Sequence, residues 1–225
     1  MKHPLKLTIA GILLGGVALF QNASASVMYE SLPGSNSNHI SRHGVAGPVL
    51  ADDFTPSRSG SVTQIDWWGS APILTGAADS WEITFHPDAG GAPSTTFPTG
   101  KLSQHFVNAG GTDPDADGIY FYTAIWNPMD LFLSAGTDYW FSVANASGGT
   151  WTWSNGLAPT VGSEQYDAMV STGVGPDGGP HFGPWVGIAD TDFAFRIHTV
   201  PEPATLVLMM LGLAGLGFSI RGKRN

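Results

Sequence analysis

The sequence predicts an all-β protein, an antiparallel two-sheet β-sandwich of jelly-roll-like type, with an N-terminal signal peptide and a C-terminal transmembrane helix. Three observations on residues 26–199, the body of the chain, predict the sandwich. Short runs of β-branched and aromatic residues recur, clusters of Gly, Pro, Asn, Asp or Ser separate most of them, and no convincing helical period appears. About nine to eleven short strands separated by such turns are typical of a two-sheet sandwich.

Seven of these runs are predicted as strands from their residue types. The alternation is clearest in residues 81–86, where Trp81, Ile83 and Phe85 point to one face and the polar residues between them point to the other. The aromatic residues near the end of the body repeat this alternation. The seven predicted strands cover residues 62–68, 81–86, 101–107, 119–126, 137–144, 150–153 and 192–198.

The first 25 residues are predicted to be a secretory signal peptide. Lys2 and Lys6 precede a long apolar run, and Ala23-Ser24-Ala25 offers small residues at the cleavage positions. We therefore expect signal peptidase to remove residues 1–25, so that the mature chain of an exported protein begins at Ser26.

The segment 200–225 begins with a stiff tripeptide. Pro201 and Pro203 fix their own backbone φ angles and favour an extended conformation in the residues before them. Glu202 is therefore displayed on a strand-like segment, the shape in which proteases usually bind their substrates. Pro203 also suits the first turn of a following helix.

The uncharged apolar stretch 204–220 follows the tripeptide and is predicted to be a transmembrane helix. Its strongly apolar residues favour insertion by about 2.5 to 5 kcal/mol, and at about 1.5 Å per residue it spans roughly 25 Å. Arg221, Lys223 and Arg224 form a membrane stop whose basic side chains remain on the cytoplasmic side. The alternative, a buried helix of a soluble domain, would not need an apolar surface on all sides that ends in a basic cluster.

The tripeptide Pro201–Pro203, the Leu/Gly-rich helix and the basic end together resemble the PEP-CTERM sorting signal of exopolysaccharide-producing Gram-negative bacteria. In that family the signal is a substrate of exosortase, a membrane-embedded cysteine protease that cleaves near Pro-Glu-Pro. The resemblance implies that Pro201, Glu202 and Pro203 are acted upon by exosortase. It also implies an intermediate anchored in the inner membrane, followed by transfer to the cell envelope, the surface or the extracellular matrix. It implies nothing about the activity of residues 26–199.

The body is acidic and contains no cysteine. Residues 26–199 hold four of the nine Lys and Arg residues and seventeen of the eighteen Asp and Glu residues, so their formal charge is −13. This charge argues against nucleic acid as a partner and is compatible with cation binding or with solubility alone. Without disulfides, packing must stabilise the fold, with a structural Ca²⁺ ion as an additional candidate.

One acidic motif predicts where such an ion could bind. Asp113, Asp115 and Asp117 alternate before Gly118, as in the first half of an EF-hand or dockerin-like Ca²⁺ loop. Ala124 stands where such a loop carries its bidentate Glu, so the motif is either a Ca²⁺ site completed by other groups or an acidic solvent-exposed turn. Two further pairs are candidates for a separate structural cation site or are polar strand ends: Asp52 with Asp53, and Asp190 with Asp192.

The eight tryptophans of the body allow two interpretations. Exposed indoles stack on sugar rings, so Trp68, Trp151 and Trp153 are candidate residues for binding exopolysaccharide. Large aromatic residues also fill the space between packed sheets, and this interpretation is favoured for the set as a whole.

Catalysis finds little support in the residue patterns. The sequence contains no Gly-x-Ser-x-Gly elbow, no His-Glu-x-x-His motif and no Gly-rich phosphate loop. Glu164 and an Asp could form a glycosidase pair only if the fold brought two carboxylates within about 5 to 10 Å. We therefore expect a non-enzymatic surface protein with a structural or adhesive role. A carbohydrate-binding module is the alternative, and a polysaccharide-active hydrolase is the third hypothesis.

Overall fold

The computed structural model describes residues 25–42, 48–74, 77–94, 103–126, 131–171 and 184–200, with no side-chain description for 36–38 and 104. The predicted signal peptide except Ala25, and the predicted sorting segment except Val200, lie outside these ranges. Within the described ranges, no helix is long and apolar enough to cross a membrane.

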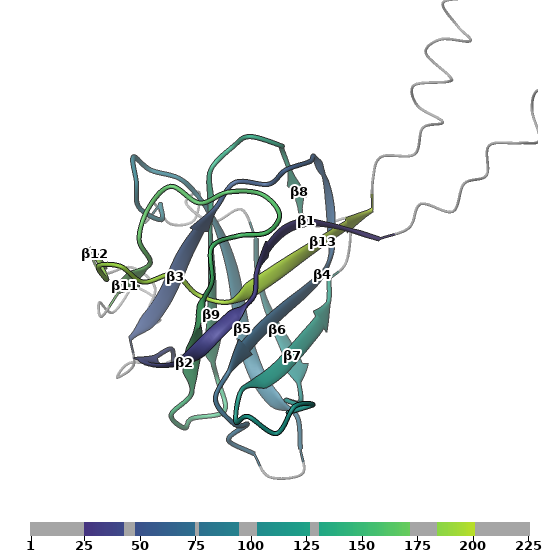
Figure 1. The fold of residues 1–225 in the computed structure, drawn as a ribbon, viewed down its shortest axis with the longest axis vertical. Coiled ribbons are helices and arrows are strands. Elements are labelled where there is room, and N and C mark those ends of the chain that lie inside the picture. The colour runs from purple at the N-terminus through teal and green to yellow at the C-terminus, as the bar shows by residue number, and fades with distance from the viewer. Residues whose placement is uncertain are drawn as a thin grey trace, which may run out of the picture. The chain divides into compact units, whose positions relative to one another are not determined.

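The described chain forms two antiparallel sheets, which confirms the predicted all-β, two-sheet class (Figure 1). In the first sheet the order is β1 (Ser26–Ser31), β13 (Phe195–Val200), β4 (Gly60–Gly69), β10 (Thr152–Gly156) and β2 (Pro33–Ile40), and β7 (Tyr120–Ile125) and β8 (Phe132–Leu133) also pair with β4. In the second sheet the order is β12 (Trp185–Gly187), β11 (Met169–Ser171), β3 (Val49–Phe54), β9 (Tyr139–Asn145), β5 (Asp79–Pro87) and β6 (Ser103–Ala109). The jelly-roll-like connectivity stays a prediction.

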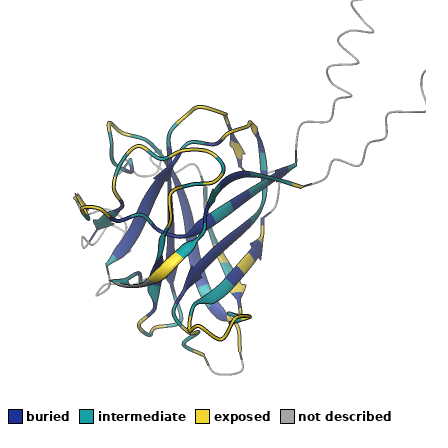
Figure 2. Ribbon diagram, in the orientation of Figure 1, coloured by how far each residue is buried: buried dark blue, intermediate teal, exposed yellow. Residues whose placement is uncertain are grey.

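Aromatic side chains fill much of the space between the sheets. The ring of Trp81 lies 5.4 Å from that of Trp67 and 4.8 Å from that of Trp151, both in edge-to-face contact. Trp153 stacks on Phe193 with a centroid separation of 4.7 Å. Figure 2 shows the strands of both sheets as largely buried. Since the chain has no cysteine, this aromatic packing takes the place that disulfides often have in small exported domains.

The alternation predicted for β5 is present, and both of its faces are buried. Trp81, Ile83 and Phe85 belong to the core between the sheets. On the other face, Glu82, Thr84 and His86 are also only 1 % exposed. On that face the His86 ring lies 5.9 Å from the ring of Trp185, the first residue of the edge strand β12 of the same sheet.

Six strands of the described residues lie outside the predicted runs: β1, β2, β3, β8, β11 and β12. The sequence of β2 is rich in Ser, Asn and Gly, and it becomes a strand through its antiparallel pairing with β10. The continuous strand β3 contains two adjacent aspartates, although Asp is depleted in strands. Pairing with β9 and β11 on its two sides overrides that local preference.

Candidate functional site

The two adjacent aspartates of β3 point to opposite faces of their sheet. Leu50, Asp52 and Phe54 share one face of the strand, and Leu50 and Phe54 belong to the core. Asp52 is fully buried at this place. Its Oδ2 accepts a hydrogen bond from the backbone N–H of Phe193 at 2.6 Å, whereas its Oδ1 has no hydrogen-bond partner. Burial of an unpaired carboxylate oxygen is costly, so this position requires an explanation.

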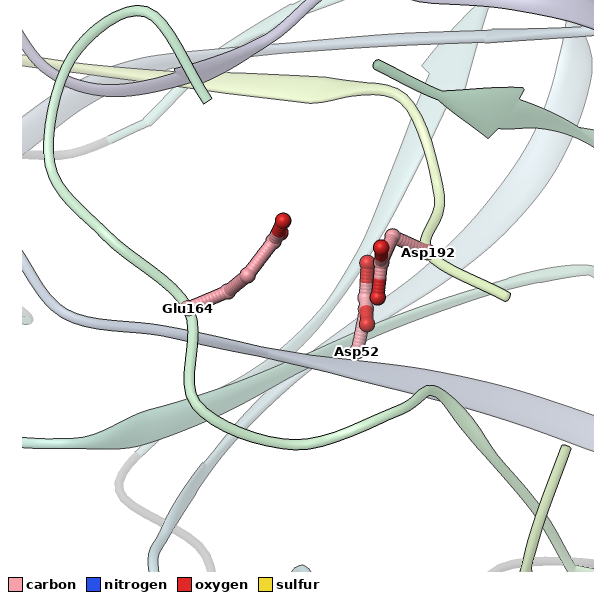
Figure 3. A group of neighbouring side chains, drawn as sticks. All are labelled: Asp52, Glu164 and Asp192. Carbon is pink, nitrogen blue, oxygen red and sulfur yellow. The ribbon is translucent and has the colours of Figure 1, made fainter. Parts of the chain in front are cut away.

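Two more carboxylates approach Asp52 (Figure 3). Glu164 comes from the loop between β10 and β11, and Asp192 comes from the segment between β12 and β13. One carboxylate oxygen from each of the three residues lies within 4.8 Å of the other two. The Tyr29 hydroxyl donates a hydrogen bond to Oε2 of Glu164 at 3.0 Å. We call Asp52, Glu164 and Asp192 the carboxylate cluster.

Asp53 positions the loop that carries Glu164. Its carboxylate accepts hydrogen bonds from the backbone N–H groups of Gln165 and Tyr166, at 2.8 and 3.1 Å. On the other side of Glu164, the Thr55 N–H donates to the Ser163 carbonyl at 2.7 Å. Both neighbours of Glu164 in the sequence are therefore bonded to β3 or to the residue that follows it, which directs Glu164 toward the cluster.

Burial and repulsion between carboxylates raise the pKa of each group in the cluster. Burial raises the pKa of Asp52 well above its usual value, although the hydrogen bond from Phe193 opposes this. Burial and then the charge of Asp192 raise the pKa of Glu164 to about 7. Burial and then Asp167 raise the pKa of Asp192. The charged neighbours that cause these pKa shifts are carboxylates, so the ionised cluster attracts cations.

Glu164 and Asp192 line a cavity of about 510 Å³. Water and small ions can therefore reach two of the three carboxylates of the cluster. Asp52 is not among the lining residues, in agreement with its full burial. The other residues that line the cavity are Gly91, Gln165, Tyr166, Asp167, Met169 and Gly187.

This arrangement suits two kinds of chemistry. Three carboxylate oxygens within 4.8 Å of one another can share one hard divalent cation. The pair Glu164 and Asp192, which faces the cavity, could instead serve as an acid and a base. The fully buried third carboxylate, with one unpaired oxygen, favours the cation, because an acid–base pair does not require it.

The structure combines the two acidic pairs that the sequence offered as separate cation sites. It takes Asp52 from the first pair and Asp192 from the second, and it adds Glu164. Asp53 instead holds the 157–168 loop, and Asp190 lies exposed in a turn with a φ of 53°. Sequence reasoning considered Glu164 only as a member of a glycosidase pair.

The predicted Ca²⁺ loop does not bring its carboxylates together. Asp113, Asp115 and Asp117 are all described, yet they do not form a three-carboxylate group of the kind seen at Asp52. The carboxylate of Asp113 accepts hydrogen bonds from the backbone N–H groups of Asp117 and Gly118, at 3.2 and 3.1 Å. This segment is therefore an acidic turn in which a carboxylate accepts hydrogen bonds from the backbone of the turn itself. Among the described residues, the candidate cation site lies at the carboxylate cluster instead.

The structure corrects the prediction of a glycan platform at Trp68, Trp151 and Trp153. Trp151 and Trp153 are fully buried, and their ring N–H groups donate to the carbonyls of Ser70 and Ala194, at 3.1 and 2.9 Å. Trp68 is 9 % exposed, and the Arg196 guanidinium carbon lies 5.3 Å from its ring centroid. Stacking on a sugar requires an exposed indole face, which these three side chains do not offer.

The predicted sorting residues Pro201–Pro203 and the membrane-stop residues Arg221, Lys223 and Arg224 lie outside the described residues. The sequence of residues 199–224 matches the family model described as the PEP-CTERM protein-sorting motif. The chain therefore carries this motif, as the resemblance predicted, and the motif implies export and exosortase-dependent sorting to the cell envelope or surface. Comparison with curated proteins and with solved structures gives no match.

Proposed function

We propose that this PEP-CTERM protein is a non-enzymatic structural or adhesive component of the cell surface or extracellular matrix. One observation supports this proposal: the same chain carries a sorting motif and a β-sandwich whose core is filled by buried aromatic side chains. Packing of rings such as Trp81 and Trp151 gives the body a fold that does not depend on disulfide formation after export. A body of this kind is suited to persist outside the cell.

The proposed route to the surface has three steps. Signal peptidase first removes residues 1–25. The predicted transmembrane helix 204–220 then holds the exported body at the inner membrane, with the basic residues that follow it on the cytoplasmic side. Exosortase finally cleaves near Pro201–Pro203 and passes the body to the envelope, the surface or the matrix.

A replacement experiment tests the structural role separately from sorting. A host that lacks the protein receives either the wild-type chain or a matched chimera, in which an unrelated exported β-sandwich replaces residues 26–199. Both chains should reach the surface, because both keep the signal peptide and the sorting segment. Only the wild-type chain should restore the cohesion of cell aggregates. Equal restoration by the chimera would contradict a specific role for the body.

Binding of exopolysaccharide is the alternative role for the body. Because Trp68, Trp151 and Trp153 are buried, such binding would have to use other residues. Retention of the mature protein on immobilised exopolysaccharide, measured against an unrelated polysaccharide, distinguishes this role from a purely structural one.

One observation supports a polysaccharide-active hydrolase as a second candidate. Glu164 and Asp192 line one cavity, and one carboxylate oxygen of each lies within 4.8 Å of the other, whereas the two carboxyl groups of retaining glycosidases are roughly 5–5.5 Å apart. We expect no release of reducing ends from exopolysaccharide by the wild-type protein. Release that Glu164→Gln abolishes would replace the structural proposal with this one.

A further inference from the structure

The carboxylate cluster combines three acidic groups with one buried oxygen that lacks a partner. Asp52 is fully buried, its Oδ1 accepts no hydrogen bond, and Figure 3 shows its side chain close to those of Glu164 and Asp192. We propose that Asp52, Glu164 and Asp192 form a Ca²⁺-binding site that joins β3 to the 157–168 loop and to the segment before β13. This proposal goes beyond the role in the matrix and does not depend on it.

The distances in the cluster suit one Ca²⁺ ion. Ca²⁺ binds oxygen at about 2.3–2.6 Å, so two ligand oxygens on opposite sides of the ion lie up to about 5 Å apart. One oxygen from each of the three carboxylates lies within 4.8 Å of the others. A single ion between them can therefore contact all three oxygens in the backbone arrangement of this structure.

The ligand types favour Ca²⁺ over other divalent cations. All three donors are carboxylate oxygens, which hard cations prefer to the nitrogen and sulfur ligands of Zn²⁺. Mg²⁺ keeps several water molecules and is usually bound by one or two carboxylates, whereas Ca²⁺ accepts six to eight oxygens in a flexible geometry. The cavity lined by Glu164 and Asp192 admits water for the remaining positions.

Bound Ca²⁺ would connect three segments that are distant in the sequence. Asp53 already bonds the 157–168 loop to the outer side of β3, and Asp52 bonds the segment at Phe193 to its inner side. A Ca²⁺ ion would add a third connection and would neutralise the charge that these contacts bring together. In a cysteine-free body, such an ion supplies a cross-link of the kind that a disulfide supplies elsewhere.

Calorimetric titration with CaCl₂ tests the site directly, with mature protein purified from its host and stripped with EDTA. We expect one Ca²⁺ per chain, with a Kd of about 10⁻³ M or tighter, the range of extracellular Ca²⁺ modules. At a hundredfold excess over Kd, Ca²⁺ should raise Tm by about 5–10 °C. No binding by the wild-type protein at about 10 mM, tenfold above that range, would overturn the proposal. A Tm increase with Mg²⁺ equal to that with Ca²⁺ would overturn the assignment to Ca²⁺.

Matched variants place the ion at the cluster. Glu164→Gln and Asp192→Asn should each weaken Ca²⁺ binding at least tenfold, while their Tm in EDTA should equal or exceed that of the wild type, which shows that they fold. Asp190→Asn changes an exposed residue two positions before Asp192, and this variant should bind Ca²⁺ like the wild type. Asp115→Asn, in the acidic turn, should also bind like the wild type. Wild-type affinity in both cluster variants, or loss of binding in Asp115→Asn alone, would refute the site.

Discussion

Asp52 accepts a hydrogen bond from the backbone N–H of Phe193, with an N to Oδ2 distance of 2.6 Å, although 141 residues separate the two in the sequence. The bond joins the middle of β3 in one sheet to the segment just before β13 in the other. The Phe193 ring also stacks on Trp153, at 4.7 Å. One short segment thus contributes a polar contact to the carboxylate cluster and an aromatic contact to the core, so the two are structurally connected.

In EDTA, the Tm of the protein should rise as the pH falls from about 8 to about 5. Burial and then Asp192 raise the pKa of Glu164 to about 7, and burial raises that of Asp53 to about 6. Both lie above the values near 4 expected in the unfolded chain. Between these values the folded state binds more protons than the unfolded state, so stability is lost as the pH rises through the folded pKa values.

Circular dichroism melting at several pH values measures this effect. Glu164→Gln removes one of the titrating groups and should show a smaller rise in Tm than the wild type. Ca²⁺ should also reduce the rise, because bound ion keeps the carboxylates ionised. A wild-type Tm in EDTA that falls steadily with acidification over this range would contradict the electrostatic description of the cluster.

Trp153→Ala should lower the free energy of unfolding by about 3–5 kcal/mol, the usual cost of removing a buried aromatic side chain. Trp153 is fully buried, stacks on Phe193 and donates a hydrogen bond to the Ala194 carbonyl. Urea unfolding measures the change, and Trp153→Phe should cost less because it keeps part of the ring contact. Unchanged stability together with lost exopolysaccharide binding would restore the glycan-platform interpretation.

Gly69→Ala should destabilise the body by about 3 kcal/mol through steric conflict. A Cβ atom at Gly69 would lie 2.2 Å from Cζ2 of Trp151 and 2.4 Å from the backbone oxygen of Thr152. Neither atom can move easily, because one belongs to a packed indole and the other to the backbone. Gly110→Ala is the control, since a Cβ there meets nothing within 4 Å. Equal urea midpoints for the two variants would show that the strands near Gly69 pack differently.

Arg196→Met, on the outer face of the first sheet, should lower the free energy of unfolding by about 1–3 kcal/mol. Arg196 pairs with Glu30 and lies 3.5 Å from Oδ2 of Asp66, a carboxylate that is only 1 % exposed. Met keeps an unbranched side chain of similar length but removes the guanidinium, which lies over the Trp68 ring and pairs with Asp66. The exposed Arg58, changed to Met, is the control, and its unfolding free energy should stay within about 0.5 kcal/mol of the wild type. A similar loss at both positions would indicate a general effect of net charge.

The strands that could be predicted from the sequence are those with aromatic or β-branched alternation. The run around Trp81 and Phe85 is an example, because apolar residues on its core face alternate with polar residues on its other face, and this period of two is visible locally. The polar strand β2 carries no such pattern and depends on its pairing with β10. Whether each tryptophan is exposed could not be predicted from the sequence either, because tryptophan occurs both in cores and on binding surfaces.

The carboxylate cluster could be predicted only in part. Two aspartates inside the apolar run Val49–Phe54 are a local signal, since a charged residue in a buried strand is costly without a partner. Nothing around Glu164 indicates that it meets Asp52, because their proximity arises from the sheet pairing and from the loop that Asp53 holds. Contacts between residues so far apart in the sequence are set by the tertiary fold and leave no local sequence pattern.

The intact mass of the protein at the surface of an exosortase-producing host tests the sorting of this body most directly. We expect the wild-type protein to lack residues 1–25 and the basic residues Arg221–Arg224, after cleavage near Pro201–Pro203. Glu202→Ala should accumulate in the membrane fraction with its C-terminal segment uncut. Recovery of the uncut 23.6 kDa chain from the cytosol, with no shorter form at the surface, would contradict the account.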